Sequence, residues 1–461
     1  MNSDTRRRGS SQLRPRGAPL PSAVETIAFW RDPHAYLRWC RRRYGSTFTM
    51  TPLGKPPLVF MSDAADIRAI VTAPADVLRP GEGGTVIAPL VGRDSFMLAD
   101  GDDHLVGRRR ILPGFQPQRV SAHAGMLMAT VADEIAAWPL GVPIALGGRL
   151  RALTLRVILH TIFGDADARV ATLHRHLLEM FQVAATLTLH MPPLRHAPPW
   201  RRIWRRFLAD RKRVDSILED LILERAHSRA HDRGLLGMLI GPRHVAGGPE
   251  AIREVRDTIM SLILAGHETT GSELAWAVQL VAHHPRVRQR LVAELQAGGG
   301  DYLEAVVREV LRHRPVFLFT IPRAVAKACT IGGRTFHPPV HLVGCLHLMQ
   351  HDAALYSDPE SFRPERFLCG PPPAEAWMPW GGGRKTCPGR HLALVEMQTV
   401  LRALFQHLHV EPTNDRVETG RWRTVIVTPG DECRVVLTAR STRARTPHIE
   451  RAPLLNRYFR S

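Results

Sequence analysis

The segment Trp380-Gly381-Gly382-Gly383-Arg384-Lys385-Thr386-Cys387-Pro388-Gly389 decides how the rest of the chain is interpreted. Its three glycines allow the backbone to approach a flat ligand closely and allow N–H groups to point at the Cys387 sulfur. Those donors, together with the N-terminus of the helix expected to follow, lower the pKa of a thiol. A thiolate here can ligate iron, and a thiolate opposite bound oxygen favours O–O cleavage. An inert buried cysteine in a glycine-rich turn is the alternative interpretation.

The longest stretch with helical spacing runs from about Glu250 to His284 and ends at a proline. Such a helix would be about 50 Å long, enough to cross a domain. At its centre, Gly266 allows another group to come near, and Thr269 can hydrogen-bond to the carbonyl four residues earlier and bend the helix. Glu268 and Thr269, an acid beside a hydroxyl, could relay protons to a bound oxygen species. A polar surface patch is the alternative, and the sequence does not continue as the HExxH motif of zinc proteases.

A third feature is the pair Glu309 and Arg312, three residues apart on a helix predicted over Tyr302–Arg314. An acid and a base at this spacing lie on one helix face. Taken alone, they form an ordinary intrahelical ion pair that stabilises the helix by roughly 0.2–0.5 kcal/mol. The pair therefore acquires a specific meaning only from the motifs around it.

Four motifs follow one another along the chain: Glu268-Thr269, Glu309 with Arg312, Phe362-Arg363-Pro364-Glu365-Arg366-Phe367, and Cys387. In this order and at these spacings they resemble the cytochrome P450 family. The resemblance extends from about residue 20 to residue 437 and is greatest to the soluble bacterial members. It implies a mainly α fold with small peripheral β-sheets, built as a single large domain around a long central helix.

The resemblance also implies roles for particular residues. Cys387 would be the axial ligand of the iron of haem b, and Glu268 with Thr269 would be the acid–alcohol pair of oxygen activation. Glu309, Arg312 and Arg366 would form a buried charge cluster that holds the haem-ligand loop to the core. Removing one member of such a buried pair typically costs about 3–5 kcal/mol of stability, because a charge is left without its partner.

The two haem propionates need cationic partners, and the family pattern places these at His104, Arg108, Arg323 and Lys385. His104 and Arg108 are four residues apart and so share one helix face. Lys385 stands where the family commonly has arginine, which keeps the charge but loses the bidentate geometry. The residues expected to contact the haem also include Ala265, on the substrate side, and Gly389, beside the ligand cysteine.

The sequence predicts one haem domain over residues 23–440, between a disordered basic tail (1–22) and a basic C-terminal tail (441–461). Within the domain, helical spacing extends from Ala23 to Tyr44, and Thr47–Met61 divides into two short β-type runs. Arg79–Gly92 is rich in glycine and proline and is predicted to be a loop. Residues 422–438 are predicted to form a terminal hairpin around Pro429-Gly430.

Composition limits the alternatives. The 461 residues carry 62 Lys plus Arg against 43 Asp plus Glu, a formal charge of +19 that favours acidic partners or nucleic acid. A nucleic-acid-binding protein is only a remote alternative, because aromatic residues make up just 6% of the chain and one arginine run overlaps the expected propionate contacts. The six cysteines contain no CxxC pair, which favours a reducing compartment such as the cytoplasm. No transmembrane anchor is expected, since no window approaches the ~20 apolar residues that span a bilayer.

Together these features predict a haem-thiolate monooxygenase that inserts one atom of dioxygen into an apolar small molecule. The apolar segment Val316-Phe317-Leu318-Phe319 favours a fatty acid, an alkane or a terpenoid as substrate. Electrons are expected from a separate acidic ferredoxin or flavodoxin, and the enzyme is expected to be a monomer. A peroxide-driven peroxygenase is the alternative, although such an enzyme does not need Glu268-Thr269. His347 and His351 have the i,i+4 spacing of metal ligands but lack a third ligand nearby, so they are expected to be packed or solvated side chains.

Overall fold

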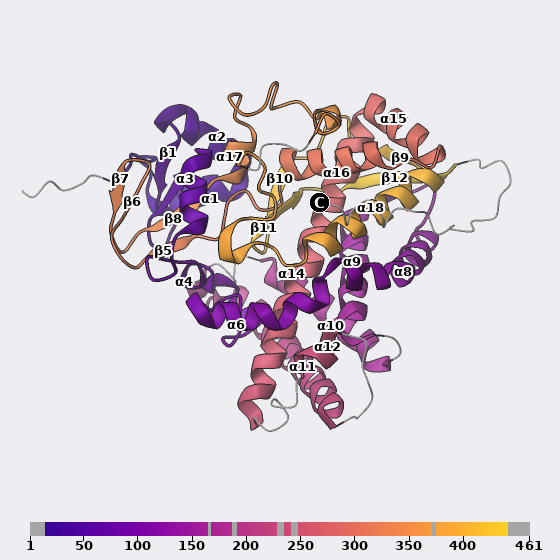
Figure 1. The fold of residues 1–461 in the computed structure, drawn as a ribbon, viewed down its shortest axis with the longest axis horizontal. Helices are drawn as coiled ribbons and strands as arrows, with labels where there is room; N and C mark the ends of the chain where they lie inside the picture. Colours follow the sequence, from indigo (N-terminus) through magenta and orange to yellow (C-terminus); the bar gives the residue numbers. More distant parts are fainter. Residues whose placement is uncertain are drawn as a thin grey trace, which may run out of the picture.

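The computed structural model describes residues 14–164, 167–186, 191–227, 235–240, 248–370 and 375–440. The fold is mainly helical with small separate sheets, as the sequence predicted (Figure 1). Its α-helices are α1 (Ser22–Arg31), α2 (Pro33–Tyr44), α3 (Ala64–Thr72), α4 (Pro80–Gly83), α5 (Ala88–Val91), α6 (Gly101–Ile111), α7 (Pro117–Ala122), α8 (Ala124–Ala136), α9 (Leu146–Phe163), α10 (Ala168–Ala184), α11 (Trp200–His227), α12 (Leu235–Leu239), α14 (Gly248–His283), α15 (Pro285–Gln296), α16 (Asp301–His313), α17 (Leu346–Gln350) and α18 (Arg390–His407).

The strands are short and lie at the periphery of the helical core. They are β1 (Thr47–Met50), β2 (Leu58–Met61), β3 (Leu78–Arg79), β4 (Pro143–Ala145), β5 (Arg323–Val325), β6 (Cys329–Ile331), β7 (Arg334–Phe336), β8 (His341–Gly344), β9 (Leu408–Pro412), β10 (Gly420–Arg423), β11 (Ile426–Pro429) and β12 (Arg434–Ala439). The largest sheet has the order β1-β2-β8-β5-β3, with β2 and β8 parallel and the other neighbours antiparallel. Figure 1 shows this sheet beside α1, α2 and α3, at one end of the molecule.

The long helix α14 runs through the middle of the molecule and is buried along most of its 36 residues (Figure 1). A helix that is largely apolar all round is stable only when other elements cover it. Two glycines allow α9 to approach it closely. A Cβ at Gly271 would lie 2.8 Å from Arg151 Cα, and one at Gly266 would lie 2.9 Å from Ile158 Cγ1. The group that comes near Gly266 is therefore a side chain of α9.

The N-terminal segment is more ordered than expected. Gly17 pairs with Thr49 of β1, whose N–H donates to Arg16 O at 3.1 Å and whose hydroxyl donates to Pro15 O at 2.7 Å. The expected disordered tail over 1–22 is therefore wrong from residue 14 onward, because this segment extends the edge of the sheet. Residues 1–13 and the expected C-terminal tail 441–461 lie outside the described residues.

Two other local predictions need correction. The helical stretch Ala23–Tyr44 is two helices, because the proline at position 33 ends the first, and the Asp32 carboxylate caps the second by accepting from Ala35 N at 2.9 Å. The predicted loop Arg79–Gly92 contains the short helices α4 and α5. In both places the sequence indicated the general course of the chain, but not where the individual helices begin and end.

The C-terminal hairpin lies earlier than predicted. Strands β10 and β11 pair from Gly420↔Pro429 to Arg423↔Ile426, so the turn is at residues 424–425 and not at Pro429-Gly430. Strand β12 instead pairs with β9 and β4. The chain leaves the hairpin because the Glu418 carboxylate accepts from the backbone N–H groups of residues 431, 433 and 434, which fixes the bend before β12.

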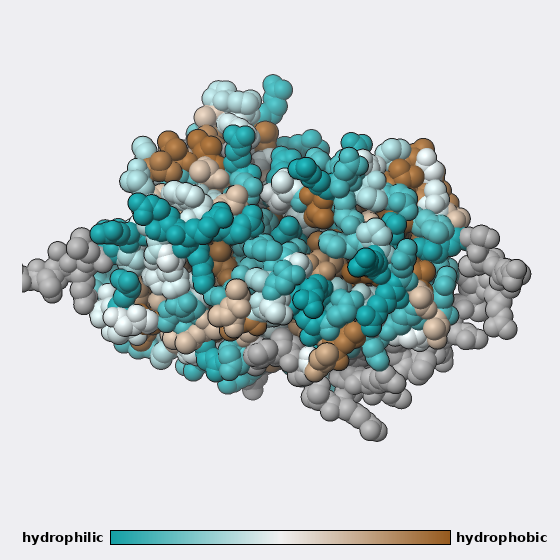
Figure 2. Space-filling view, turned by 90° about the horizontal axis from the view of Figure 1, so that it is seen from above, coloured by the Kyte–Doolittle hydropathy of each residue, from teal (hydrophilic) through white to brown (hydrophobic). Residues whose placement is uncertain are grey.

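The surface of the molecule is mainly hydrophilic (Figure 2). Figure 2, which looks onto the molecule from above, shows small groups of apolar residues separated by hydrophilic ones. Among the described helices, none has the length and apolar character needed to cross a membrane. All six cysteines are free, as the absence of a CxxC pattern suggested.

The close contact of α9 with α14 gives a first prediction. Gly271→Ala should destabilise the fold by about 1–3 kcal/mol, because the added methyl group meets backbone atoms of Arg151 that cannot move aside. Gly125→Ala is the matched control: it lies in α8, where a Cβ meets nothing within 4 Å, and should be neutral or slightly stabilising. Urea unfolding followed by circular dichroism measures both, and equal effects of the two changes would contradict this interpretation.

Candidate active site

The cysteine loop turns sharply before α18. Gly381 and Gly383 have φ values of +67° and +64°, a region that other residues rarely adopt. A Cβ at Gly383 would also lie 2.0 Å from Val71 O of α3. Cys387 N donates to Trp380 O at 2.9 Å and closes the loop. Both glycines thus serve the turn, and Gly383 also allows the loop to pack against α3, whereas the space beside Gly381 is open within 4 Å.

The Cys387 thiol is set just before the N-terminus of α18. Burial raises its pKa, while the Gly389 N–H and the charges of Arg108 and Arg390 act in the opposite direction. The Gly389 N–H lowers the thiol pKa as predicted, but burial outweighs it and the net shift is upward. A coordinating metal deprotonates a thiol outright, so this site fits a metal ligand better than a free thiolate.

The centre of α14 has an accessible strip in an otherwise buried helix. Ala265 is exposed, and Gly266 and Thr269 are partly exposed, whereas the residues from 257 to 264 and from 270 to 282 are buried. Thr269 Oγ1 donates to Ala265 O at 2.6 Å, as its position predicted. The helix nevertheless remains continuous through this point. An accessible strip on a helix that crosses the core fits a surface against which a flat group lies.

Glu268 is placed differently from Thr269. Its carboxylate is 2% exposed and accepts from Arg423 Nε at 3.1 and 3.2 Å, and His267 Nε2 lies 3.5 Å from it. Burial alone would raise its pKa, but Arg423 and His267 outweigh burial and lower the pKa to about 2. The acid is thus an ionised partner of Arg423, and the structure does not join it to the Thr269 hydroxyl.

Two residues in this region had no signal in the sequence. Arg423 ends strand β10, far from Glu268 along the chain, and nothing in its neighbours marks it as an ion-pair partner. Glu273 lies one turn beyond Thr269 and is buried, which raises its pKa to about 8. Its carboxylate accepts from Val316 N at 2.9 Å and so fixes the start of the apolar segment after α16.

Three of the four predicted propionate partners form one network with the cysteine loop. Arg108 Nη1 donates to Thr386 O at 2.6 Å, and His104 Nε2 lies 3.2 Å from Arg384 O. Lys385 Nζ lies 3.1 Å from His104 Nδ1 and also donates to the carbonyls of residues 97 and 99. Burial and the Lys385 charge lower the pKa of His104, while its contacts with the carbonyls of residues 96 and 384 oppose this.

Arg323 is the fourth predicted partner. It is 5% exposed, its Nε has no hydrogen-bond partner, and burial lowers its pKa to about 10. Burial lowers the pKa of Lys385 to about 8, with Arg323 and Arg108 adding to the effect and Asp100 opposing it. Within the part of the chain that the structure describes, none of these three cations is in a salt bridge. Three cations in mutual repulsion fit a group that brings two carboxylates, as haem does.

The predicted charge cluster is assembled around Glu309. Arg312 Nε and Nη2 donate to the two Glu309 oxygens at 2.7 and 2.9 Å, and Arg366 Nε donates at 3.1 Å. Glu309 and Arg312 are 0% exposed. Both arginines also donate to backbone carbonyls between residues 350 and 361, which ties this segment to α16. The histidines His347 and His351 are packed ring against ring at 4.3 Å, as expected of core side chains.

Comparison with known proteins agrees with this geometry. A family model described as Cytochrome P450 matches residues 15–434. The chain is a member of the cytochrome P450 family. Cytochrome P450 135B1 of Mycobacterium tuberculosis is 32% identical over 441 residues, covering 93% of this P450 and 92% of the relative. Cytochrome P450 137 of the same organism is 31% identical over 431 residues, covering 91% and 90%.

Solved structures show the same fold. A cyanobacterial CYP120A1 with bound retinoic acid superposes with a TM-score of 0.79 at 23% identity, covering 93% of this chain and 100% of that one. The heme domain of cytochrome P450DA gives a TM-score of 0.80 at 19% identity, with 93% and 98% coverage. Membership of the family makes this P450 an oxygenase of the haem-thiolate type.

The Glu268–Arg423 pair gives a second prediction. Arg423→Gln should destabilise the P450 by about 3–5 kcal/mol at pH 7, because it leaves a buried carboxylate without its cation. The double variant Glu268→Gln/Arg423→Gln should regain most of this loss. Arg421→Gln, at an exposed arginine of the same strand, is the control and should change little. Urea unfolding measures all four proteins, and a double variant as unstable as the single one would refute the pairing.

The same pair predicts a pH dependence. The folded-state pKa of Glu268, about 2, lies below its ordinary value of 4.5, so its stabilisation is complete above pH 4.5 and is lost as the pH falls toward 2. The difference in unfolding free energy between the wild type and Glu268→Gln should therefore shrink across this interval. A difference that stays constant from pH 5 to pH 3 would contradict the assigned pKa.

Proposed function

We propose that this P450 holds haem b through the Cys387 sulfur and inserts one atom of dioxygen into an apolar small molecule. The observation that carries the proposal is the joining of the cysteine loop to α6, through the Arg108–Thr386 and His104–Arg384 contacts. A loop tied in this way places a sulfur ligand and carboxylate partners around one group. When bound, a haem with a thiolate ligand supplies the chemistry of dioxygen activation.

The cofactor would be held by residues from four elements. Arg108 of α6, Arg323 of β5 and Lys385 of the loop would pair with the propionates, which removes their mutual repulsion. His104, beside Lys385, would contribute a hydrogen bond through its ring. Ala265 of α14 would face the porphyrin, since it is exposed at the centre of the buried helix, and Gly389 would leave the sulfur side open, since a Cβ there meets only Phe115 at 4.0 Å.

Thr269 and Glu268 would have separate tasks in proton delivery. The Thr269 hydroxyl lies on the accessible strip of α14 and donates to Ala265 O, so its oxygen lone pairs are free to accept a hydrogen bond from water. In a relay it would take a proton from that water as it releases its own. Glu268 stays ionised at neutral pH and is held by Arg423. It would serve as a proton acceptor from solvent only when its carboxylate leaves Arg423.

The substrate would be apolar. Val316 and Leu318 are buried, whereas Phe317 and Ile321 are each 37% exposed, so the segment after α16 presents large apolar side chains at its surface. Glu273 fixes the start of this segment through Val316 N. A fatty acid, an alkane or a terpenoid has the apolar surface that such side chains would bury.

We infer that the electrons arrive from a separate acidic protein, a ferredoxin or a flavodoxin. Arg384 and Arg390 are exposed on either side of Cys387, and Arg109 and Arg119 are exposed on α6 and α7. This arginine face would attract an acidic partner to the sulfur side of the haem. The free cysteines suit a reducing compartment, and we propose that the enzyme acts as a monomer in the cytoplasm.

Absorption spectroscopy tests the cofactor assignment. The reduced, carbon-monoxide-bound protein should give the strongly red-shifted band of a thiolate-ligated haem. Cys387→Ser should lose this band, because the hydroxyl is a much weaker ligand, whereas Cys369→Ser, at an exposed cysteine, should keep it. A Cys387→Ser protein that retains the band, or a wild type that takes up no haem, would overturn the proposal.

The docking face predicts a salt dependence. Stopped-flow reduction of the P450 by an acidic ferredoxin should slow about tenfold between 0.05 and 0.5 M salt, because exposed charges are screened within a few ångströms at high salt. Arg384→Glu should lower the low-salt rate, while Arg42→Glu on α2, also exposed, should leave it unchanged. A rate indifferent to ionic strength would contradict the docking face. Full turnover with hydrogen peroxide alone would favour the peroxygenase instead.

A further inference from the structure

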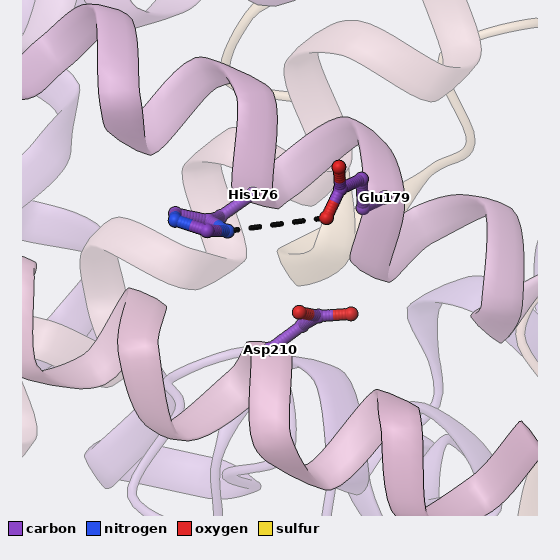
Figure 3. Close-up of side chains that lie close together, drawn as sticks. All are labelled: His176, Glu179 and Asp210. Carbon is purple, nitrogen blue, oxygen red and sulfur yellow. Dashed lines mark ion pairs between the residues drawn. The ribbon is translucent and has the colours of Figure 1, made fainter. Parts of the chain in front are cut away.

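A group of potential metal ligands lies between α10 and α11, outside the site described above. His176 and Glu179 are one turn apart on α10, and Asp210 faces them from α11 (Figure 3). One ligand atom from each of the three lies within 4.8 Å of the others. Among the described residues, this is the group of three or more such side chains that meets this spacing.

The Asp210 carboxylate is buried without a full set of partners. The residue is 2% exposed, and its Oδ2 has no hydrogen-bond partner. Nδ1 of His176 is also buried and has no hydrogen-bond partner, and Glu179 Oε2 lies 4.0 Å from it. Figure 3 shows the Asp210 carboxylate pointing toward the space between the other two side chains. A buried carboxylate oxygen left unsatisfied is costly, unless a bound group completes its interactions.

We propose that His176, Glu179 and Asp210 bind a Zn²⁺ ion that bridges α10 and α11. Zinc takes imidazole nitrogen and carboxylate oxygen ligands at about 2.0–2.2 Å, and three protein ligands leave a fourth position for water. Ligand atoms around such an ion lie about 3.4 Å apart, so each pair of these ligand atoms must approach by at most about 1.4 Å. Glu179 is 39% exposed on its side chain and provides the route by which the ion enters.

Two arginines lie beside Asp210 but leave one of its carboxylate oxygens available to an ion. Arg213 Nη1 donates to Asp210 Oδ1 at 3.1 Å, which leaves Oδ2 for the ion, and Arg206 Nε lies 3.9 Å from Oδ2. The side chains of both arginines are more than 60% exposed. They can therefore turn into solvent when a cation binds, so their repulsion is screened.

The ligand set selects among cations. One imidazole with two carboxylates suits Zn²⁺, whereas Mg²⁺ prefers oxygen ligands alone and keeps several waters. None of the three residues takes part in the proposed haem site. The zinc site therefore stands or fails independently of the proposed monooxygenase function.

Equilibrium dialysis of the haem-loaded protein against Zn²⁺ tests the proposal. Elemental analysis of zinc and iron together gives the number of zinc ions per haem, and one tight zinc per haem is expected. Asp210→Asn removes the charge but keeps the shape of the side chain and its contact with Arg213. Glu179→Gln likewise removes the charge of the exposed ligand and keeps its shape. Each should weaken zinc binding by about tenfold or more. The red-shifted carbon-monoxide band should be unchanged in both variants, and this result would show that they are folded.

His227→Gln is the control, because this exposed histidine lies on α11 outside the group. It should bind zinc as the wild type does. Zinc at 100 times its dissociation constant should raise the melting temperature of the wild type by about 3 °C, and of Asp210→Asn much less. The proposal is overturned if Asp210→Asn and Glu179→Gln bind zinc as tightly as the wild type, if His227→Gln weakens it equally, or if Mg²⁺ gives the same shift.

Discussion

The Glu309 carboxylate carries a full charge at a position without solvent, and the path of the chain from residue 350 to residue 366 depends on it. Such a charge is tolerated only because two guanidinium groups and the N–H of Arg363 surround it. The same guanidinium groups satisfy backbone carbonyls of a segment that has almost no regular secondary structure. A loop without helix or strand bonds thus becomes fixed, and the cysteine loop that follows it starts from a fixed position.

Much of the fold was predictable because strong local signals coincide with it. The 36-residue helix α14 was expected almost to the residue, since its long apolar pattern stops at a proline. The hairpin near the C-terminus was displaced, because the carboxylate of Glu418, distant from the predicted turn, decides where the chain bends. The order of residues 14–17 depends on pairing with Thr49, a contact between segments that no local pattern reveals.

In the candidate site, too, residues in local motifs were predictable, whereas contacts between distant segments were not. Cys387, Glu309, Arg312 and Arg366 occur in motifs whose spacing is specific, and the structure brings the last three together. The partner of Glu268 was not predictable, because Arg423 reaches it from a strand 155 positions away along the chain. The pKa shifts were harder still to predict: the lowered pKa of His104 and the raised pKa of the Cys387 thiol both come mainly from burial, which is a property of the folded molecule.

The β10–β11 hairpin has a consequence for the tolerance of this region to insertions. Side chains alternate between the two faces of a strand, so Trp422 is buried beneath the hairpin where Arg423 reaches Glu268. A shift of one position in the β10–β11 register would exchange these two faces. An indole ring would then confront the ionised carboxylate, while a guanidinium would be forced among the rings of Phe29 and Phe319 that now surround Trp422. A single residue inserted in the turn at residues 424–425, where Thr424 is itself buried, would therefore change the contacts of this hairpin with α14 if it shifted the register.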